Sequence, residues 1–482
     1  MEYRITRSGP LVQLKPWSPG VESLLQYDHV AFAPGSKTPA TERRLLYHLD
    51  PKEDCGYFPV ACAEDVMDIL RKGDHSVIYE DPRDMRRFFP EPQWDRVDEL
   101  RSGQKEVLEA IVKNDHGLIV CSTGFGKSFC IKQICKMYPK LNFIIVAPGV
   151  AEMINLYQPL MAEFGVQEVG SLGGSGRNDP TRRITVSTMA SLAKADFSRC
   201  EIFIFDEAHS LGHNKTTFRL MGRLEDSRVY GFTATPVGRS DHTDNVIKAV
   251  FGRELVNYTY QECEAAGSVT PIDVFIYDIE GDIESSQSSF GNTFIANKRR
   301  FYWRNELRNV CIAALATVIP KDQQVLIMVE SVDHLITLGQ YLPDYALVCG
   351  AGNDLDLRAR KRRIKLTNRM GDSKEENKKI YAEFKEGTLK RVISSMTWKQ
   401  GVSFDGLNVL IRADGSPSKI SSTQIPGRLS RLAPGKDKAI LVDFADKFNP
   451  TAKNNFYSRL RNYRKNGWRI VMKGDPLDEK FE

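Results

Sequence analysis

The stretch CSTGFGKS, Cys121–Ser128, contains the residue types of a loop that binds the phosphates of a nucleotide. Gly124 and Gly126 allow the backbone to turn its N–H groups toward phosphate oxygens. Lys127 supplies a positive charge for the outer phosphates, and the hydroxyl of Ser128 can ligate Mg²⁺. An apolar run precedes the loop and a helical pattern follows it, which is the setting that phosphate binding requires. A glycine-rich turn without a ligand is the alternative, and this setting disfavours it.

Two adjacent acids, Asp206 and Glu207, follow the apolar stretch IFIF later in the chain. In an open α/β sheet, ligands bind at the carboxyl ends of the strands. Asp206 would there hold Mg²⁺ through water, and Glu207 would activate the water that attacks a γ-phosphate. Alternatively, the two acids only cap the next helix, but the phosphate loop earlier in the chain favours the catalytic interpretation.

A third group of residues lies in the stretch QIPGRLSR, Gln424–Arg431. Arg428 and Arg431 are three residues apart, so on a helix they would share one face. If two domains close on each other, these arginines would reach a γ-phosphate as arginine fingers. Taken alone, the pattern would indicate only a basic helix face.

Short apolar runs alternate with helical patterns and would form the elements that position these residues. Near-continuous apolar strands separated by helices indicate parallel sheets covered on both faces, so we predict two α/β domains, 96–258 and 259–482. Strands are expected at 117–121, 143–148, 184–188, 202–206, 229–234, 273–279, 324–330, 345–350, 391–396, 408–414 and 439–444, and a long helix at 301–319.

Residues 1–95 differ from the rest of the chain, because Pro, Gly and charged residues interrupt short apolar pieces. One helical pattern, Ala63–Gly73, ends on a glycine, which is a good stop signal. This composition predicts a small α+β domain, with residues 81–95 as a connector to the next domain.

The composition excludes several other classes of protein. A chain of 482 residues is too long for one hydrophobic core, and it has no apolar run near the roughly 20 residues that span a bilayer. Its N-terminus lacks the apolar core of a secretory signal, and its nine cysteines contain no C-x-x-C pair. We therefore expect a cytoplasmic protein without a membrane partner, a zinc site or an iron–sulfur site.

Two basic runs stand out against a mild net charge of +5. One is Arg358–Lys365, and the other, Arg459–Arg469, includes Tyr463 and Trp468. Basic and aromatic residues together can grip phosphates and stack on bases, but each run can equally be a solvated face.

In their order along the chain, these stretches resemble the motifs of superfamily 2 helicases and translocases. The resemblance covers roughly residues 97–450. LRSGQ at 100–104 resembles the adenine-recognising motif, and TGFGKS at 123–128 resembles motif I. The later counterparts are DEAH at 206–209 for motif II, TAT at 233–235 for motif III, ISSMTWKQGVSFDG at 393–406 for motif V and QIPGRLSR for motif VI.

The resemblance implies roles for individual residues in binding and hydrolysing ATP with Mg²⁺ between two tandem RecA-like domains. Catalytic roles fall on Lys127, Asp206, Glu207, Arg428, Arg431 and Gln424. Nucleotide-binding roles fall on Arg101, Gln104, Thr123, Gly124, Phe125, Gly126, Lys127, Ser128, Gly401 and Asp405. Ser128 and Asp206 would hold Mg²⁺. Contacts to the nucleic-acid backbone would come from Pro148, Gly149, Thr188, Thr397 and Trp398.

The compact plan is most similar to phage-encoded DNA helicases that remodel branched intermediates, and to XPB-like and RecG-like remodellers. This implies a monomeric DNA helicase for forks, junctions or R-loops in replication, recombination or repair, in a bacterial or virus-infected cytoplasm. Its partners would be single-stranded and branched or duplex DNA, with RNA in hybrids. The N-terminal domain would recognise duplex or branch, and the C-terminal basic–aromatic segment would grip DNA. An RNA helicase or RNA-stimulated ATPase is the alternative; a scaffold that hydrolyses ATP poorly is disfavoured, because the catalytic residues are all present.

Overall fold

The computed structural model describes most of the chain and divides it into two compact units. The described residues are 1–31, 40–82, 90–174, 179, 181–211, 220–224, 227–234, 242, 244–279, 297–398, 404–417, 426–447 and 450–472. The first unit is Met1–Ser122 with Gly126–Tyr258, and the second is Thr123–Phe125 with Thr259–Glu482.

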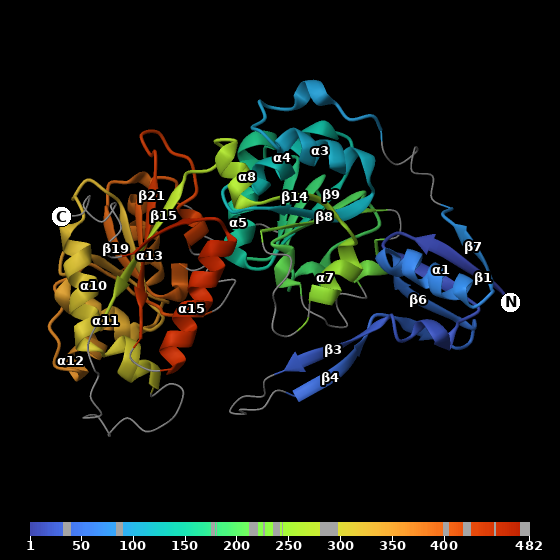
Figure 1. The fold of residues 1–482 in the computed structure, drawn as a ribbon. Coiled ribbons are helices and arrows are strands. Elements are labelled where there is room, and N and C mark those ends of the chain that lie inside the picture. Colours follow the sequence, from blue (N-terminus) through green and yellow to red (C-terminus); the bar gives the residue numbers. More distant parts are fainter. Residues whose placement is uncertain are drawn as a thin grey trace. The chain divides into compact units, whose positions relative to one another are not determined.

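The N-terminal part of the first unit is a small α+β module, as predicted. Its sheet has the order β5-β6-β2-β1-β7, with α1 (Ala63–Lys72) beside β7 (Figure 1). The strands are β1 Glu2–Ser8, β2 Leu11–Lys15, β5 His48–Asp50, β6 Cys55–Pro59 and β7 Ser76–Glu80. Tyr3 and Ile5 alternate with exposed residues on β1 and share a core with Val66 and Leu70 of α1. The period of two thus places one face of the sheet against the helix.

A separate antiparallel ribbon, β3 (Gln26–Ala31) with β4 (Ala40–Leu45), joins this module to the following domain. Tyr27 and Leu46, at the base of the ribbon, belong to the same apolar cluster as Leu118 of the larger sheet. Arg7 of β1 adds an ion pair of 2.6 Å to Asp115. The module and the first large sheet therefore share one packed unit.

The first large sheet is parallel throughout its described pairs and has the order β10-β11-β9-β12-β13-β8-β14. Its strands are β8 His116–Cys121, β9 Phe143–Ala147, β10 Val169–Leu172, β11 Ile184–Thr188, β12 Ile202–Asp206, β13 Arg228–Thr233 and β14 Glu254–Tyr258. Its helices include α3 Gln104–Lys113, α4 Lys127–Met137, α5 Val150–Phe164 and α7 Asp244–Phe251. The five predicted strands are confirmed, and β10 and β14 are additional.

The second large sheet is also parallel and has the order β18-β17-β19-β16-β20-β21-β15-β22. Its strands are β15 Ile272–Asp278, β16 Val325–Met328, β17 Ala346–Val348, β18 Met370–Gly371, β19 Arg391–Ser394, β20 Val409–Arg412, β21 Ala439–Ala445 and β22 Arg469–Met472. Its helices include α10 Glu306–Val318, α11 Val332–Tyr341, α12 Leu355–Lys361, α13 Lys374–Glu386 and α15 Pro450–Lys465. All six predicted strands are confirmed, which gives the expected pair of RecA-like sheets.

The single helix predicted at 301–319 is wrong in its first part. A short π-helix covers Arg299–Trp303, and α10 begins only at Glu306. The side chain of Asn305 accepts a hydrogen bond from the backbone N–H of Arg308, so it caps a new helix and interrupts the old one.

The C-terminal basic–aromatic segment is divided between the core and the surface. Its two aromatic rings and Arg459 are enclosed and cannot contact DNA, whereas Arg461, Arg464, Lys465 and Arg469 are exposed, so a grip on DNA through these cations stays a prediction. Arg459 and Tyr463 are fully buried, and Trp468 is nearly so. Arg459 Nε and the Tyr463 hydroxyl both donate to Asp443 Oδ2, at 2.8 and 2.7 Å. A second carboxylate, Asp446, accepts from Arg459 and Arg308. The charge of Arg459 thus stabilises the packing of α15 on the sheet, because buried charges must be paired.

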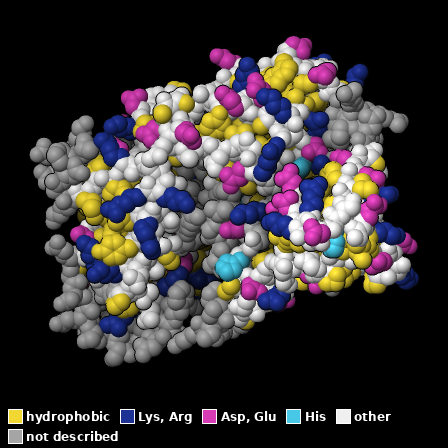
Figure 2. Space-filling view, turned by 45° about the vertical axis from the view of Figure 1, so that its right-hand side comes forward, with side chains coloured by type: hydrophobic (Ala, Val, Ile, Leu, Met, Phe, Trp, Pro, Cys, Tyr) yellow, Lys and Arg dark blue, Asp and Glu magenta, His cyan; other side chains and the backbone are white. Residues whose placement is uncertain are grey.

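The charged surface is mixed rather than uniformly basic on the face in view. Lys, Arg, Asp and Glu side chains are interspersed there (Figure 2). Within the described residues, no helix has the length and apolar character needed to cross a membrane.

Candidate functional site

The candidate phosphate loop connects β8 to α4 in the predicted strand–loop–helix arrangement. Cys121 is the fully buried last residue of β8, and α4 begins at Lys127. Gly124 and Gly126 have φ values of +92° and +100°, which L-residues with a side chain rarely adopt. A Cβ on Gly126 would also lie 2.7 Å from Gln104 Nε2. The loop therefore requires glycine at this position for two independent reasons.

Lys127 and Glu207 lie close together although eighty positions separate them in the sequence. Lys127 Nζ is 3.8 Å from Glu207 Oε1, and the two side chains are 10% and 27% exposed. They meet because β8 and β12 are parallel strands of one sheet, whose carboxyl ends lie at the same edge. Glu207 follows β12 with a φ of +53°, a left-handed conformation that is uncommon for a glutamate. Strained backbone of this kind is concentrated at functional sites.

The two acids of this site have opposite pKa shifts. Burial, together with the neighbouring charge of Glu207, raises the pKa of Asp206. Burial also opposes ionisation of Glu207, but the charge of Lys127 and a hydrogen bond from His209 hold its pKa below the usual value. Glu207 is thus the ionised member at neutral pH, and Asp206 is the acid that a nearby cation would ionise.

Asp206 fits the role of an Mg²⁺ ligand. Its Oδ1 atom is buried and has no hydrogen-bond partner among the described residues, so a cation there would satisfy it. In the described part of the chain, no group of three or more His, Cys, Asp or Glu side chains could hold a metal by itself. A site with few protein ligands is typical of Mg²⁺ that arrives with nucleotide phosphates and retains water. Ser128, the second residue of α4, is the other expected ligand.

His209 links the acidic pair to the next strand. Its Nδ1 lies 3.1 Å from the hydroxyl of Thr233, the last residue of β13, and 3.2 Å from Glu207 Oε2. His209 is 5% exposed, so its ring is held by these neighbours rather than by water. Thr235, the other threonine of the TAT stretch, lies outside the described residues.

The residues predicted to recognise adenine lie just before and at the start of α3. Gln104, the first residue of α3, is buried, and its Oε1 accepts the backbone N–H of Arg101 at 2.9 Å. The preceding segment is fastened to α4 through Asp98, whose carboxylate accepts from Lys136 at 2.5 Å and from Gln133 at 2.9 Å. These contacts hold Gln104 against the phosphate loop.

In the second unit, the structure changes the prediction for the two arginines. They do not share a helix face, because Pro426–Arg428 forms a short 3₁₀ turn that does not continue as a helix. Arg428 is buried, whereas Arg431 donates from Nη1 to Asp405 Oδ1 at 3.3 Å. Two further predicted residues, Gln424 and Gly401, lie outside the described residues.

Lys436 is a residue of this region that sequence analysis missed. Its Nζ donates to the backbone carbonyls of Asp405 and Arg431, at 3.1 and 3.0 Å. Burial lowers its pKa to about 8. Lys436 therefore holds together the segments that carry Asp405, predicted to bind the nucleotide, and Arg431, predicted to be catalytic. No motif marks it, because its partners are backbone carbonyls, which every residue type carries.

Most residues predicted to contact nucleic acid lie at carboxyl ends of strands. Pro148 and Gly149 follow β9, with Gly149 as the N-cap of α5, and Thr188 ends β11. Thr397 follows β19, and its hydroxyl is 3.0 Å from that of Ser395. The ends of neighbouring parallel strands form one edge, so each set lies at the ligand-binding edge of its sheet.

The prediction for Trp398 is wrong. Its side chain is 3% exposed and packs against the rings of Tyr381, Phe384 and Phe404. The indole Nε1 donates to Asn377 Oδ1 at 3.3 Å. An indole enclosed in this way cannot stack on a base, so Trp398 supports the turn that carries Thr397.

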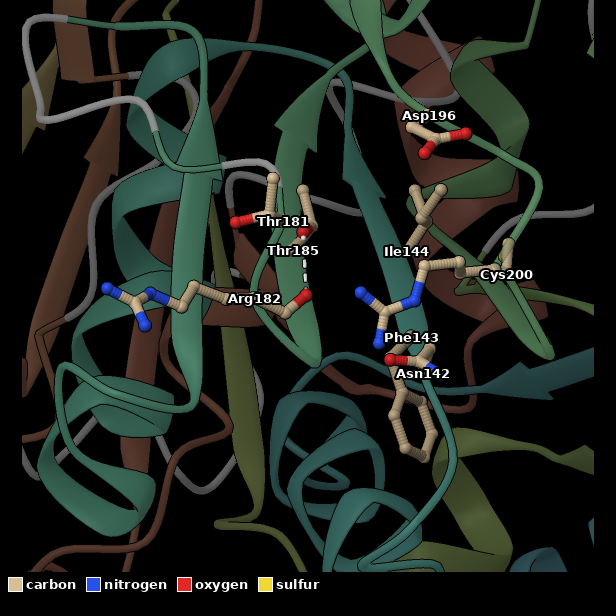
Figure 3. A pocket seen from close by; sticks show the side chains of 9 residues that line it. Asn142, Phe143, Ile144, Thr181, Arg182, Thr185, Asp196 and Cys200 are labelled. Carbon is tan, nitrogen blue, oxygen red and sulfur yellow. Dashed lines mark hydrogen bonds between the residues drawn. The ribbon is translucent and has the colours of Figure 1, made fainter.

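A small pocket of about 50 Å³ lies at the opposite end of the first large sheet (Figure 3). Asn142 and Phe143 at the start of β9, and Thr185 near the start of β11, contribute to its lining. The Arg182 guanidinium points away from the other labelled side chains, and the Thr185 hydroxyl donates to the Arg182 carbonyl at 3.3 Å. The pocket is separate from the carboxyl edge where Lys127, Asp206 and Glu207 are found.

The chain is similar to proteins of known class. Residues 98–238 match the family model described as type III restriction enzyme, res subunit. The DNA 3'-5' translocase XPB2 of Sulfurisphaera tokodaii is 24% identical over 372 residues, which cover 72% of this chain and 82% of that protein. The residues that match the family model, 98–238, include Lys127, Asp206 and Glu207.

Solved structures share the fold of the two large sheets. S. cerevisiae Dbp5 bound to RNA and ADP BeF3 aligns with a TM-score of 0.53 and 12% identity, covering 80% of this chain and 92% of that chain. The Mycobacterium smegmatis helicase Lhr bound to ssDNA and AMP-PNP aligns with a TM-score of 0.50 and 14% identity, covering 79% of this chain and 50% of that one. Both show the tandem RecA-like architecture.

Proposed function

We propose that this chain, which belongs to the superfamily 2 helicases and translocases, is an ATP-dependent DNA motor that remodels forks, junctions or R-loops. Membership makes it an ATP-driven nucleic-acid helicase or translocase. The observation that carries the proposal is the 3.8 Å approach of Lys127 to Glu207, with buried Asp206 beside them at the carboxyl edge of the sheet. We assign the accessory domain to residues 1–95 and the motor domains to 96–258 and 259–482.

The residues of the first motor domain would hydrolyse ATP mainly by positioning and charge. The phosphate loop would bind the β- and γ-phosphates through its backbone N–H groups and Lys127. The ionised Glu207 would orient the attacking water and accept its proton. Mg²⁺, when bound through Asp206 and Ser128, would neutralise charge on the phosphates.

The second motor domain would complete the reaction. Arg428 and Arg431 would stabilise the charge that develops in the transition state, and Asp405 would help to orient Arg431. Loss of an arginine finger should lower turnover by about 10³-fold or more. Alternate opening and closure of two such domains would move the protein along one strand of the nucleic acid. The residues that would hold this strand are Pro148, Gly149, Thr188 and Thr397.

DNA is the favoured substrate because the curated relative that spans most of this chain is named a DNA translocase. An RNA-stimulated ATPase is the alternative, since the Dbp5 structure contains RNA, although at 12% identity that likeness concerns the fold alone. We assign the recognition of duplex or branch to the N-terminal module, which is attached to the first motor domain through the ion pair of Arg7 with Asp115.

ATPase assays with single-stranded DNA, forked DNA and RNA test the proposal. We expect both DNA forms to stimulate turnover more than RNA does, and we expect Lys127→Ala to abolish the activity. Lys113→Ala is a matched control, because Lys113 is a surface lysine of α3 and is 73% exposed. Stimulation by RNA alone would overturn the DNA assignment. The absence of any polynucleotide-stimulated hydrolysis would overturn the motor itself.

A further inference from the structure

A basic segment, residues 355–365, combines α12 with the four residues that follow it (Figure 1). Its exposed cations are Arg358, Arg360, Lys361, Arg363 and Lys365. Arg360 is paired with Asp356 at 2.5 Å, and in the described part of the chain no carboxylate pairs with the other four. The segment therefore presents a concentrated positive charge that no carboxylate of the described residues neutralises.

The neighbouring helix α13 shows what a balanced surface helix of this chain looks like. It carries four lysines and four glutamates, and its Glu376 pairs with Lys379 at 3.5 Å. Arg369, just before α13, pairs with both Glu376 and Glu383. A merely solvated helix face is expected to have this mixture of signs, because unpaired like charges repel one another. The basic segment departs from that pattern.

The basic segment is held firmly on the body of the second motor domain. Leu355 and Ala359 are fully buried, and the Asp354 carboxylate caps α12 by accepting the backbone N–H of Leu357 at 2.8 Å. At the other end, Arg362 donates to the Asp333 carbonyl and the Thr337 hydroxyl of α11, at 2.7 and 2.9 Å. The exposed cations are therefore presented by an ordered scaffold, so binding through them would require little additional ordering of the backbone.

The segment lies next to a predicted nucleic-acid contact. The loop Gly350–Asn353 separates β17 from α12, and a Cβ on Gly350 would lie 3.8 Å from the hydroxyl oxygen of Thr397. The loop is closed by a hydrogen bond from Asn353 Nδ2 to the Gly350 carbonyl at 2.8 Å. The basic segment therefore begins beside the edge of the second large sheet at which Thr397 would hold a nucleic-acid strand.

We propose that the basic segment binds the phosphate backbone of duplex DNA adjoining the strand held at Thr397. This inference rests on the proposed function and adds a second, duplex-specific contact to it. Proteins that grip single strands combine positive charge with aromatic side chains on which bases stack. Residues 349–380 contain no Phe, Tyr, Trp or His. A rigid, positively charged surface without stacking groups fits the regular phosphates of a duplex, which it would contact without reading sequence.

The test compares two triple variants of the full-length protein. The first, Arg358→Gln, Lys361→Gln and Lys365→Gln, removes unpaired charges of the basic segment and leaves Arg363, whose φ is +60°, in place. The matched control, Lys374→Gln, Lys378→Gln and Lys385→Gln, removes the same charge from exposed positions of α13. Affinity for a DNA duplex, a fork and a single strand is measured by fluorescence anisotropy at several salt concentrations.

We expect the first variant to bind the duplex and the fork roughly tenfold more weakly, with the slope of log K against log salt reduced by about 2 to 3. Its affinity for the single strand and its ATPase at saturating single-stranded DNA should remain unchanged, as should all properties of the α13 control. Unchanged duplex affinity and salt slope would overturn the inference, as would an equal loss in the control or an equal loss on the single strand. If DNA stimulates the ATPase of the wild-type protein but the first variant binds the duplex as tightly as wild type does, the proposed function stands and only this inference is wrong.

Discussion

The imidazole of His209 and the hydroxyl of Thr233 lie 3.1 Å apart, joining the turn after β12 to the last residue of β13. His209 also lies 3.2 Å from the Glu207 carboxylate, so the acid that would orient water is connected to the next strand through one ring. A displacement of Glu207 on loss of the γ-phosphate would therefore be transmitted to β13 through the ring of His209.

We predict that Thr233→Val lowers unwinding more than it lowers ATP hydrolysis. Valine keeps the shape of threonine but removes the hydroxyl, at a cost of about 1 kcal/mol for the lost hydrogen bond. The measurement is the number of base pairs unwound per ATP hydrolysed, which should fall several-fold. Thr185→Val, in β11 and away from His209, should leave this ratio unchanged. Equal losses of both activities in Thr233→Val would contradict a coupling role.

We predict that Glu207→Gln lowers kcat by about 10² to 10⁴-fold while nucleotide binding is retained. The amide keeps the size of the side chain but cannot accept a proton. Nucleotide affinity is measured separately with a fluorescent ATP analogue, and Glu106→Gln at the surface of α3 serves as the control. A variant that retained near wild-type kcat would exclude Glu207 as the residue that activates water.

The pH dependence of hydrolysis should also reflect Glu207. Lys127 and His209 hold its pKa below the usual value, against the effect of burial. The active, ionised form therefore persists as the pH falls, and activity is lost only when the pH passes below the ordinary glutamate pKa of about 4.3. Rates are measured over a pH series at saturating Mg²⁺, which keeps Asp206 ionised, and within the stable range of the protein. They should show no acidic limb near pH 6, and a limb that persists at saturating Mg²⁺ would contradict the ionised assignment of Glu207.

We predict that Lys436 makes stability rise with pH above about 8. Burial lowers its pKa to about 8, whereas an unfolded lysine has a pKa near 10.5. Between these values the unfolded chain binds more protons, so the free energy of unfolding increases with pH in this window and is level below it. Urea denaturation of wild type and Lys436→Met from pH 7 to 10 tests this. The difference between the two proteins should grow in favour of wild type above pH 8, and parallel curves would contradict it.

We predict that Trp398 matters for stability and not for DNA affinity. Trp398→Ala should reduce the free energy of unfolding by about 3 to 5 kcal/mol, because it leaves a cavity among Tyr381, Phe384 and Phe404. Trp398→Phe should be much milder and should bind single-stranded DNA as wild type does. Weaker DNA binding by the folded Trp398→Phe variant would restore the original assignment of this ring to nucleic acid.

Local pattern was sufficient to predict the central strands and the phosphate loop. Strands such as β9 and β12 are buried at every position, so they appear in the sequence as uninterrupted apolar runs. The edge strands β14 and β22 were missed because most of their residues are only partly buried or exposed, which leaves no apolar run to detect. The order of motifs along the chain was enough to predict an ATP site.

The sequence by itself determined which residues could do the chemistry, whereas only the tertiary structure decided which side chains are accessible to do it. Arg459 and Trp398 have the residue types of nucleic-acid contacts, yet both are enclosed. Lys436 carries no motif, yet it holds Asp405 and Arg431 together. The physical reason is that burial and pairing depend on partners contributed by distant segments. For Arg459 that partner is Asp443 of a neighbouring strand, and neither residue alone shows that the other will be there.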